Sequence, residues 1–149
     1  MNTSITLKNF FGTSEAELQE IFADWKVEPY RVHQVFTWVY HYHCRDFNEM
    51  TNLSKSLRSQ LQERFCFALP KIKTRTHSKD GSIKYLLELN DGAVVECVWM
   101  PSESRKTLCL STQVGCRLNC SFCLTASLGL KRNLTAGEII GQHIAINEE

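Results

Sequence analysis

The sequence predicts an α+β fold in which a helical part is followed by a β-meander and a final strand–loop–helix unit. Before about residue 68, apolar residues recur at helical spacing. After it, Lys79-Asp80-Gly81 and Asn90-Asp91-Gly92 mark turns between runs of β-forming residues. Closely spaced cysteines then separate a short strand from a helix. We therefore expect three regions, a helical domain at 1–68, a β-meander at 69–104 and a strand–loop–helix unit at 105–149.

The helical part contains three short amphipathic helices. Ser14 and Glu17 have the S-x-x-E spacing of a capping box, so the first helix begins there. Pro29 fits the first turn of the second helix, where its missing N–H has no partner to lose, and the third helix ends before Pro70. Their apolar stripes are Leu18, Ile21, Phe22 and Trp25; Val32, Val35, Phe36 and Val39; and Leu53, Leu57, Leu61 and Phe65. Because such short helices bury a stripe only against other elements, we predict a small bundle.

Strands occupy most of the second half of the chain. The meander strands are expected at 71–77, 83–89 and 93–100, and a further strand at 108–112. That last strand leads into Gly115 and the cysteines. Thr135 and Glu138 form a T-x-x-E capping box, which opens a helix containing Ile139, Ile140 and Ile144. Strand, long loop and helix together are the first half of a βαβ unit.

Composition and charge exclude some classes of protein. The chain is 43% hydrophobic and 22% charged with a net charge of +1, which predicts a folded protein rather than a disordered or strongly basic one. A local basic cluster could meet phosphates, although a solvated hairpin face is an equally weighted alternative. Its members are Lys71, Lys73, Arg75, Lys79 and Lys84. No targeting segment or membrane-spanning run is visible, so we expect a cytoplasmic protein whose seven cysteines are reduced thiols or metal ligands.

Three of the cysteines form a compact motif. Cys116, Cys120 and Cys123 are separated by three and two residues, so one loop can bring three thiolates to three corners of a [4Fe–4S] cluster. One iron then remains open to a ligand that the protein does not supply. Structural zinc is an alternative, but it requires a fourth ligand such as Cys109 or a distant histidine. A disulfide is poorly suited to the cytosol.

The residues around this loop resemble the radical S-adenosylmethionine superfamily, and more specifically the adenine-C2 RNA methyltransferases. The segments that carry this resemblance are Leu108–Cys116, Asn119–Cys123 and Lys131–Gln142. Tyr30-Arg31 before Gln34, together with Phe47–Ser54, is similar to the N-terminal accessory domain of these enzymes. The resemblance covers nearly the whole chain, and it is most specific at the cysteine loop.

The resemblance implies an enzyme that methylates C2 of adenine in 23S ribosomal RNA and transfer RNA, in rRNA and tRNA processing. It implies S-adenosylmethionine and a [4Fe–4S] cluster held by Cys116, Cys120 and Cys123, and an electron donor such as flavodoxin or ferredoxin. Residues 105–149 would begin a truncated partial (β/α) barrel, so we expect this N-terminal portion to be inactive alone. The related C8 enzymes share the loop, which leaves C2 and C8 methylation both open.

The resemblance also implies catalytic roles for Glu96 and Cys109. Glu96 stands thirteen residues before Cys109, where the family places a glutamate that accepts a proton. Cys109 matches a cysteine that resolves a covalent enzyme–RNA adduct by pairing with a methyl-bearing cysteine, which this chain lacks. From the residues alone, Glu96 is more readily interpreted as a strand residue facing water and Cys109 as a small buried hydrophobe. Cys44, Cys66 and Cys97 are expected to serve packing.

Two other classes of protein stay open on the sequence. The chain could be a non-catalytic RNA-binding remnant, which retained RNA binding without methylated product would favour. It could instead be a zinc-binding module, for which about one zinc and no iron per chain would be the signature.

Overall fold

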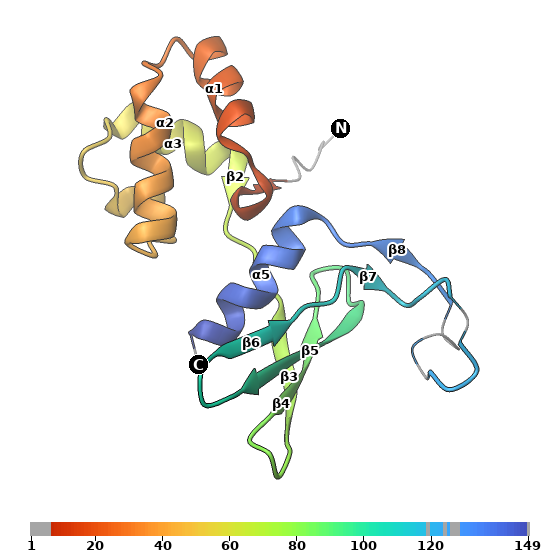
Figure 1. Ribbon diagram of the computed structural model, residues 1–149. Helices are drawn as coiled ribbons and strands as arrows, with labels where there is room; N and C mark the ends of the chain where they lie inside the picture. Colours follow the sequence, from red (N-terminus) through yellow and green to blue (C-terminus); the bar gives the residue numbers. More distant parts are fainter. Residues whose placement is uncertain (1–6, 119, 124, 126–128, 149) are drawn as a thin grey trace. The chain divides into compact units, whose positions relative to one another are not determined.

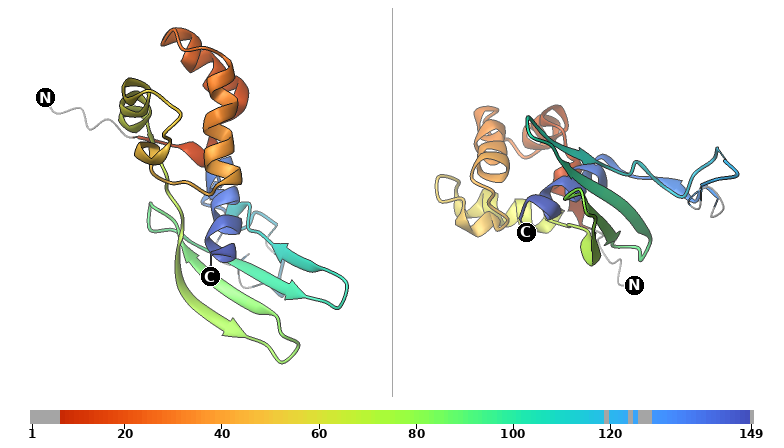
Figure 2. Two further views of the ribbon diagram at one scale, coloured as in Figure 1. Left: turned by 90° about the vertical axis from the view of Figure 1, so that its left-hand side faces the viewer. Right: turned by 60° about the horizontal axis from the view of Figure 1, so that its bottom comes forward.

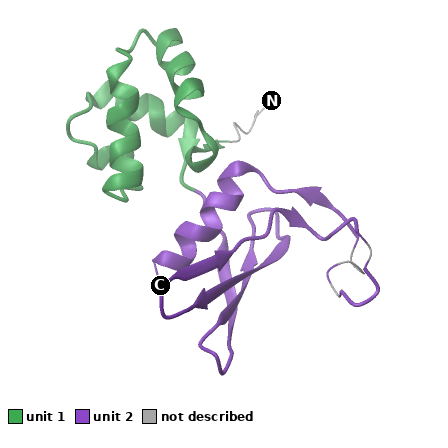
Figure 3. Ribbon diagram, viewed as in Figure 1, with its two compact units in different colours: residues 1–67 green, residues 68–149 purple. Residues whose placement is uncertain are grey.

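The computed structural model describes residues 7–118, 120–123, 125 and 129–148, so Asn119 of the cysteine loop lies outside the described residues. The chain divides into two compact units, residues 1–67 and 68–149 (Figure 3). Helices make up most of the first unit, whereas sheets and one long helix make up the second (Figure 1). This confirms the predicted α+β fold. The further boundary between 104 and 105 stays a prediction.

The first unit is built around Phe10. Strand β1 (Lys8–Asn9) pairs in parallel with β2 (Phe65–Cys66), and the 3₁₀ segment η1 (Phe10–Gly12) follows β1 directly. Phe10 is fully buried, and its ring centroid lies 5.5 Å from those of Phe36 and Phe65. No hydrophobic period marks Phe10 in the sequence, because the segment that carries it is too short to have one.

The helices of this unit are α1 (Glu15–Asp24), α2 (Tyr30–Phe36) and α3 (Lys55–Arg64), with the short 3₁₀ segment η3 (Phe47–Glu49) before α3. The predicted start of α1 is confirmed, since the Glu17 N–H donates to Ser14 Oγ at 3.2 Å. The Glu17 carboxylate accepts from the Lys8 ammonium. The predicted stripes also form the core: most of their members are buried, with Phe36 and Trp25 partly buried. Helix α2 does not stop at Phe36, however, but continues as a π-helical segment, η2 (Thr37–His41).

The second unit contains an antiparallel sheet in the order β3-β4-β5-β6 (Figures 1 and 2). Its strands are β3 (Lys71–His77), β4 (Ile83–Glu88), β5 (Val94–Pro101) and β6 (Lys106–Cys109). The predicted meander is confirmed within one residue at each end. The prediction of a strand at 108–112 was wrong in its extent, because β6 ends at Cys109. A separate short strand, β7 (Gln113–Val114), then pairs with β8 (Arg132–Asn133).

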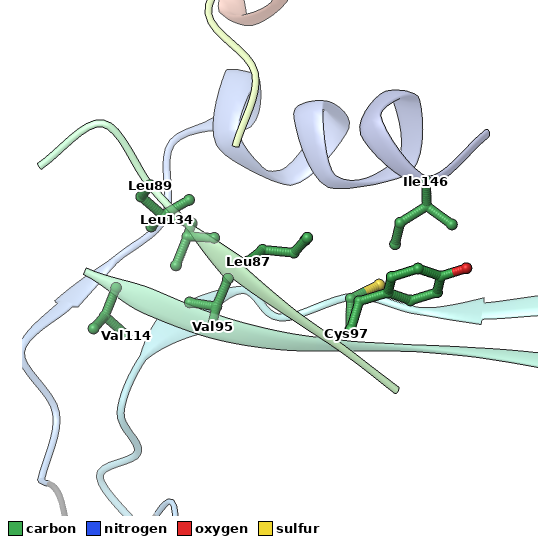
Figure 4. Close-up of a cluster of buried hydrophobic side chains, with 8 residues drawn as sticks. Leu87, Leu89, Val95, Cys97, Val114, Leu134 and Ile146 are labelled. Atoms are coloured by element: carbon green, nitrogen blue, oxygen red, sulfur yellow. The ribbon is translucent and has the colours of Figure 1, made fainter. Parts of the chain in front are cut away.

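One face of this sheet is covered by helix α5 (Ala136–Asn147). Figure 4 shows the side chains that fill the space between helix and sheet. This core consists of Tyr85, Leu87, Leu89, Val95, Cys97, Val114, Leu134 and Ile146. Because side chains alternate along a strand, the residues between these positions on β4 and β5 point to the opposite face of the sheet. Glu96 is one of them.

The start of α5 confirms the predicted capping box. The Glu138 N–H donates to Thr135 Oγ1 at 3.2 Å, and the Thr135 N–H donates to the Glu138 carboxylate at 2.8 Å. Arg132 then joins this cap to the β4–β5 turn: one guanidinium nitrogen donates to Glu138 at 2.8 Å and to Asp91 at 2.7 Å. The Arg132 guanidinium lowers the pKa of the Glu138 carboxyl. Arg132, which follows the cysteine loop, therefore has a structural partner on each side.

We expect Arg132→Ala to lower the free energy of unfolding by about 1 kcal/mol near neutral pH, a modest value because the site is partly exposed. A carboxyl with a lowered pKa in the folded state stabilises the fold above its ordinary pKa, and this contribution disappears as the pH falls through the lowered value. The difference between variant and parent should therefore shrink at an acidic pH below the ordinary pKa of a glutamate carboxyl. Urea unfolding at both pH values measures it, with Lys131→Ala as the control. An equal loss at both pH values would contradict the ionic origin.

Candidate active-site cleft

A cleft of about 670 Å³ opens on the face of the sheet that α5 does not cover. Strands β4, β5 and β6 form its floor, and the cysteine loop contributes a wall. Among its lining residues are Lys84, Glu96, Val98, Cys109, Phe122 and Cys123. Residues from three separate sequence segments thus share one cavity, and both predicted catalytic residues and one predicted cluster ligand are among them.

Glu96 lies on β5 with its side chain half exposed to the cleft. Its carboxylate forms an ion pair with the Lys84 ammonium on β4, at 3.0 Å. The carboxylate therefore faces water, as the residues alone suggested, but not from an edge strand. Strand β5 is an inner strand of the sheet, and the face that carries Glu96 borders the cleft. A carboxylate in this position is accessible to a substrate.

The main chain of Glu96 is held by a chain of hydrogen bonds that leads to α5. Ser111 Oγ donates to the Glu96 carbonyl at 2.6 Å. The Ser111 N–H donates to Gln142 Oε1 at 3.0 Å, and Gln142 Nε2 donates back to the Ser111 carbonyl at 2.8 Å. Both main-chain groups of Ser111 are thus bound to one side chain, which explains why β6 does not continue through this residue.

Gln142 is fully buried, an unusual position for an amide unless it is hydrogen-bonded on all sides. Sequence reasoning gave it no role. A signal was present, because Gln142 falls between Ile139 and Ile146 on the apolar face of its helix. A polar residue in such a position indicates a buried hydrogen-bond partner.

Cys109 is exposed and lines the cleft, opposite Val98 in the β5–β6 register. The interpretation of Cys109 as a buried hydrophobe is therefore wrong. Cys97, one residue before Val98, points to the other face and is buried, and burial raises the pKa of its thiol to about 11. Of these two neighbouring thiols, Cys97 serves packing, and Cys109 is the one that a reagent or substrate in the cleft can reach.

The cysteines of the loop are all free and partly exposed. The Cys123 N–H donates to the Cys120 carbonyl at 3.1 Å, which forms a turn between them. The Leu118 N–H donates to Cys116 Sγ at 3.4 Å, an interaction of the kind that tunes iron–sulfur clusters. Three soft thiol donors on one loop therefore fit a cluster in their chemistry. Their sulfur atoms are not gathered, since no group of three or more metal-binding side chains is found among the described residues.

The two ends of the loop meet at Gly115, immediately before Cys116. Gly115 has a φ of +77°, and a Cβ atom there would lie 1.8 Å from the carbonyl oxygen of Gly129. The Lys131 N–H donates to the Val114 carbonyl at 2.9 Å beside this contact. The close approach of two backbones thus closes the base of the loop, and glycine permits it.

The fold and the loop place the chain among radical S-adenosylmethionine methyltransferases. A crystal structure of a radical SAM methyltransferase from Sphaerobacter thermophilus superposes with a TM-score of 0.78 and 40% sequence identity, covering 93% of this chain and 41% of that one. Residues 8–67 match the family described as the ribosomal RNA large subunit methyltransferase N-terminal domain.

Two curated relatives are the dual-specificity RNA methyltransferases RlmN of Paracoccus denitrificans and Cereibacter sphaeroides. They are 53% and 51% identical over 119 residues, which is 80% of this chain and 30% of each relative. The chain belongs to this family of RNA methyltransferases, and it spans about 30% of the length of these relatives. Membership of the family implies S-adenosylmethionine and a [4Fe–4S] cluster. In the described part of the chain, no helix has the length and apolar character needed to cross a membrane.

Proposed function

We propose that this chain provides the helical domain and the first part of the catalytic domain of a radical S-adenosylmethionine RNA methyltransferase. The observation behind the proposal is the single cleft that contains Glu96, Cys109 and Cys123. An accessible carboxylate, an accessible thiol and a cluster-type cysteine come from β5, β6 and the loop. A reaction that uses a proton acceptor, a thiol and a metal cofactor needs these three groups in one cavity.

Cys116, Cys120 and Cys123 are the proposed cluster ligands. Three thiolates leave one iron of a [4Fe–4S] cluster open, and S-adenosylmethionine would bind there. When bound, the cluster supplies the electron for reductive cleavage of S-adenosylmethionine, a step that protein side chains cannot carry out. The chain orients this chemistry: Cys123 lines the cleft, and the Leu118 N–H is directed at Cys116 Sγ.

Glu96 is the proposed proton acceptor, and Cys109 the proposed resolving thiol. The ionised carboxylate is the form that accepts a proton, and Glu96 is held in an ion pair with Lys84 at 3.0 Å. The Ser111 hydrogen bond fixes the backbone that carries it. Cys109 faces the same cavity from the next strand, so a covalent adduct formed there would be within reach of its thiol.

The proposed substrate is adenine, methylated at C2, in 23S ribosomal RNA and transfer RNA. The base, the position and the two RNAs follow from the resemblance of the sequence motifs, and the relatives' names support an RNA substrate and a dual specificity. The exposed strand β3 has basic residues that suit contacts with phosphates, although Lys73 pairs with Glu88 at 3.3 Å. A cytoplasmic electron donor such as flavodoxin or ferredoxin would reduce the cluster.

The Glu96→Gln change, made at the matching position of an intact relative, tests the proposal. We expect turnover to fall by about 100-fold or more, because glutamine keeps the shape of glutamate but cannot take the proton. The iron content and the cleavage of S-adenosylmethionine without RNA should persist, and they serve as internal controls. Methylation at the rate of the parent enzyme would show that Glu96 is not the proton acceptor.

A further inference from the structure

The helical unit contains a cavity of its own, between the α2–η2 helix and the chain that leads to α3. It has a volume of about 290 Å³. Its lining residues are His33, Gln34, Thr37, Trp38, Tyr42 and Asn52. The other face of the same helix is buried in the core through Val32, Val35 and Val39. The cavity is therefore formed by the face of the helix that the core does not use.

Two aromatic rings form one side of this cavity. The centroids of Trp38 and Tyr42 are 5.3 Å apart, with an angle of 59° between the rings, and Tyr42 is 61% exposed. A large aromatic side chain exposed to this degree gains little from its own packing. Because the rings are tilted, a flat ligand can stack on one of them and contact the other with its edge.

The π-helical segment η2 sets the arrangement of these rings. The Tyr42 N–H donates to the Thr37 carbonyl at 3.1 Å, five residues back, and the Thr37 hydroxyl donates to the His33 carbonyl at 2.8 Å. A wider turn holds residues four apart more nearly in line than an α-helical turn does, and Trp38 and Tyr42 are four apart. Such π-turns are rare, and they often occur at functional sites.

Polar groups define the other side of the cavity. Trp38 Nε1 donates to Asn52 Oδ1 at 2.6 Å, so the amide NH₂ of Asn52 is the end that can donate to a ligand. The Arg31 guanidinium donates to the main-chain carbonyl of Asn52 at 2.8 Å and to Gln34 Oε1 at 2.7 Å. These bonds join two segments that are far apart in the sequence. They also place a guanidinium beside the cavity.

We propose that this cavity binds one unpaired nucleobase of the RNA substrate. Single-stranded RNA is recognised mainly through bases that stack on aromatic side chains and hydrogen-bond to nearby amides, and this cavity combines both features. Trp38 and Tyr42 provide the stacking rings, Asn52 donates to the edge of the base, and the nearby Arg31 guanidinium supplies a positive charge that favours the phosphate chain. The inference rests on the proposed function, because it names a contact with the same class of substrate.

The test uses the full chain and two fluorescein-labelled RNA hairpins closed by the same compact tetraloop, one with a single bulged adenosine in its stem and one with a fully paired stem. Fluorescence anisotropy at low and high salt separates backbone contacts, which salt weakens, from base stacking. We expect Tyr42→Ala to weaken binding of the bulged hairpin about tenfold and to leave the paired hairpin unchanged. Asn52→Asp keeps the acceptor for Trp38 but removes the amide donor. It should therefore also weaken binding of the bulged hairpin and leave binding of the paired hairpin unchanged. Gln19→Ala, at an exposed position of α1, is the matched control.

A second readout comes from Trp38 itself. With Trp25 and Trp99 replaced by phenylalanine, its emission should be quenched by the bulged hairpin and not by the paired one. Equal binding of both hairpins by the parent and by Tyr42→Ala, without quenching, would overturn the inference but leave the proposed function standing. A chain that binds neither hairpin would also overturn it, whereas the function has its own test in the Glu96→Gln enzyme. Thermal unfolding of each variant shows that it is folded.

Discussion

Replacement of Cys120 by alanine is expected to reduce the iron and sulfide bound by this chain from about four of each to near zero after reconstitution without oxygen. Cys120 is the middle cysteine of the motif. The hydrogen bond from the Cys123 N–H to the Cys120 carbonyl forms a turn that keeps these two proposed ligands near each other. Two thiolates cannot hold three corners of a cluster. The loss should therefore be nearly complete rather than graded.

Iron and sulfide analysis, together with the visible absorption of the cluster, measures this effect. Cys66→Ala is the matched control, because Cys66 is also a free, partly exposed thiol but lies in the helical unit. Cys109→Ala should also keep the full iron content, since Cys109 is proposed to face the substrate rather than the cluster. A parent chain that remains colourless, or that binds about one zinc and no iron, would refute the cluster and favour the zinc-binding alternative.

The second large effect is expected from Gly115→Ala, which should lower the free energy of unfolding by about 3 kcal/mol or more. The new Cβ would lie 1.8 Å from the carbonyl oxygen of Gly129 and 2.9 Å from its carbonyl carbon. Both are backbone atoms, so no rotation of a side chain relieves the clash. The base of the cysteine loop must open, and we expect reduced iron binding as a consequence.

Gly92→Ala provides a close control for this change. Gly92 has nearly the same backbone conformation, with a φ of +79° against +77°, but no atom beyond its two chain neighbours lies within 4 Å of the position of its Cβ. We expect this variant to lose only about 1 kcal/mol, the energy of placing alanine in a left-handed conformation. Urea unfolding followed by circular dichroism compares the two variants. If they lose the same stability, the contact between Gly115 and Gly129 does not hold the loop.

Much of the fold could be predicted from the sequence, because its rules are local. The capping residues Ser14 and Thr135 mark the starts of their helices, and the two turns that end in glycine limit the meander strands to within one residue. The spacing of the three cysteines and the residues beside them likewise identified the family. Each of these signals comes from a few neighbouring residues, whose conformational preferences act before any distant contact forms.

The tertiary structure alone decided how these parts become a site. It showed that Cys109 is exposed, that Glu96 faces the cleft from an inner strand, and that Gln142 holds Ser111 from the buried face of α5. It also joined Arg31 and Trp38 to Asn52. The residues of these contacts lie between 14 and 31 positions apart. Whether such groups meet depends on how sheets and helices pack, and no local preference of the chain contains that information.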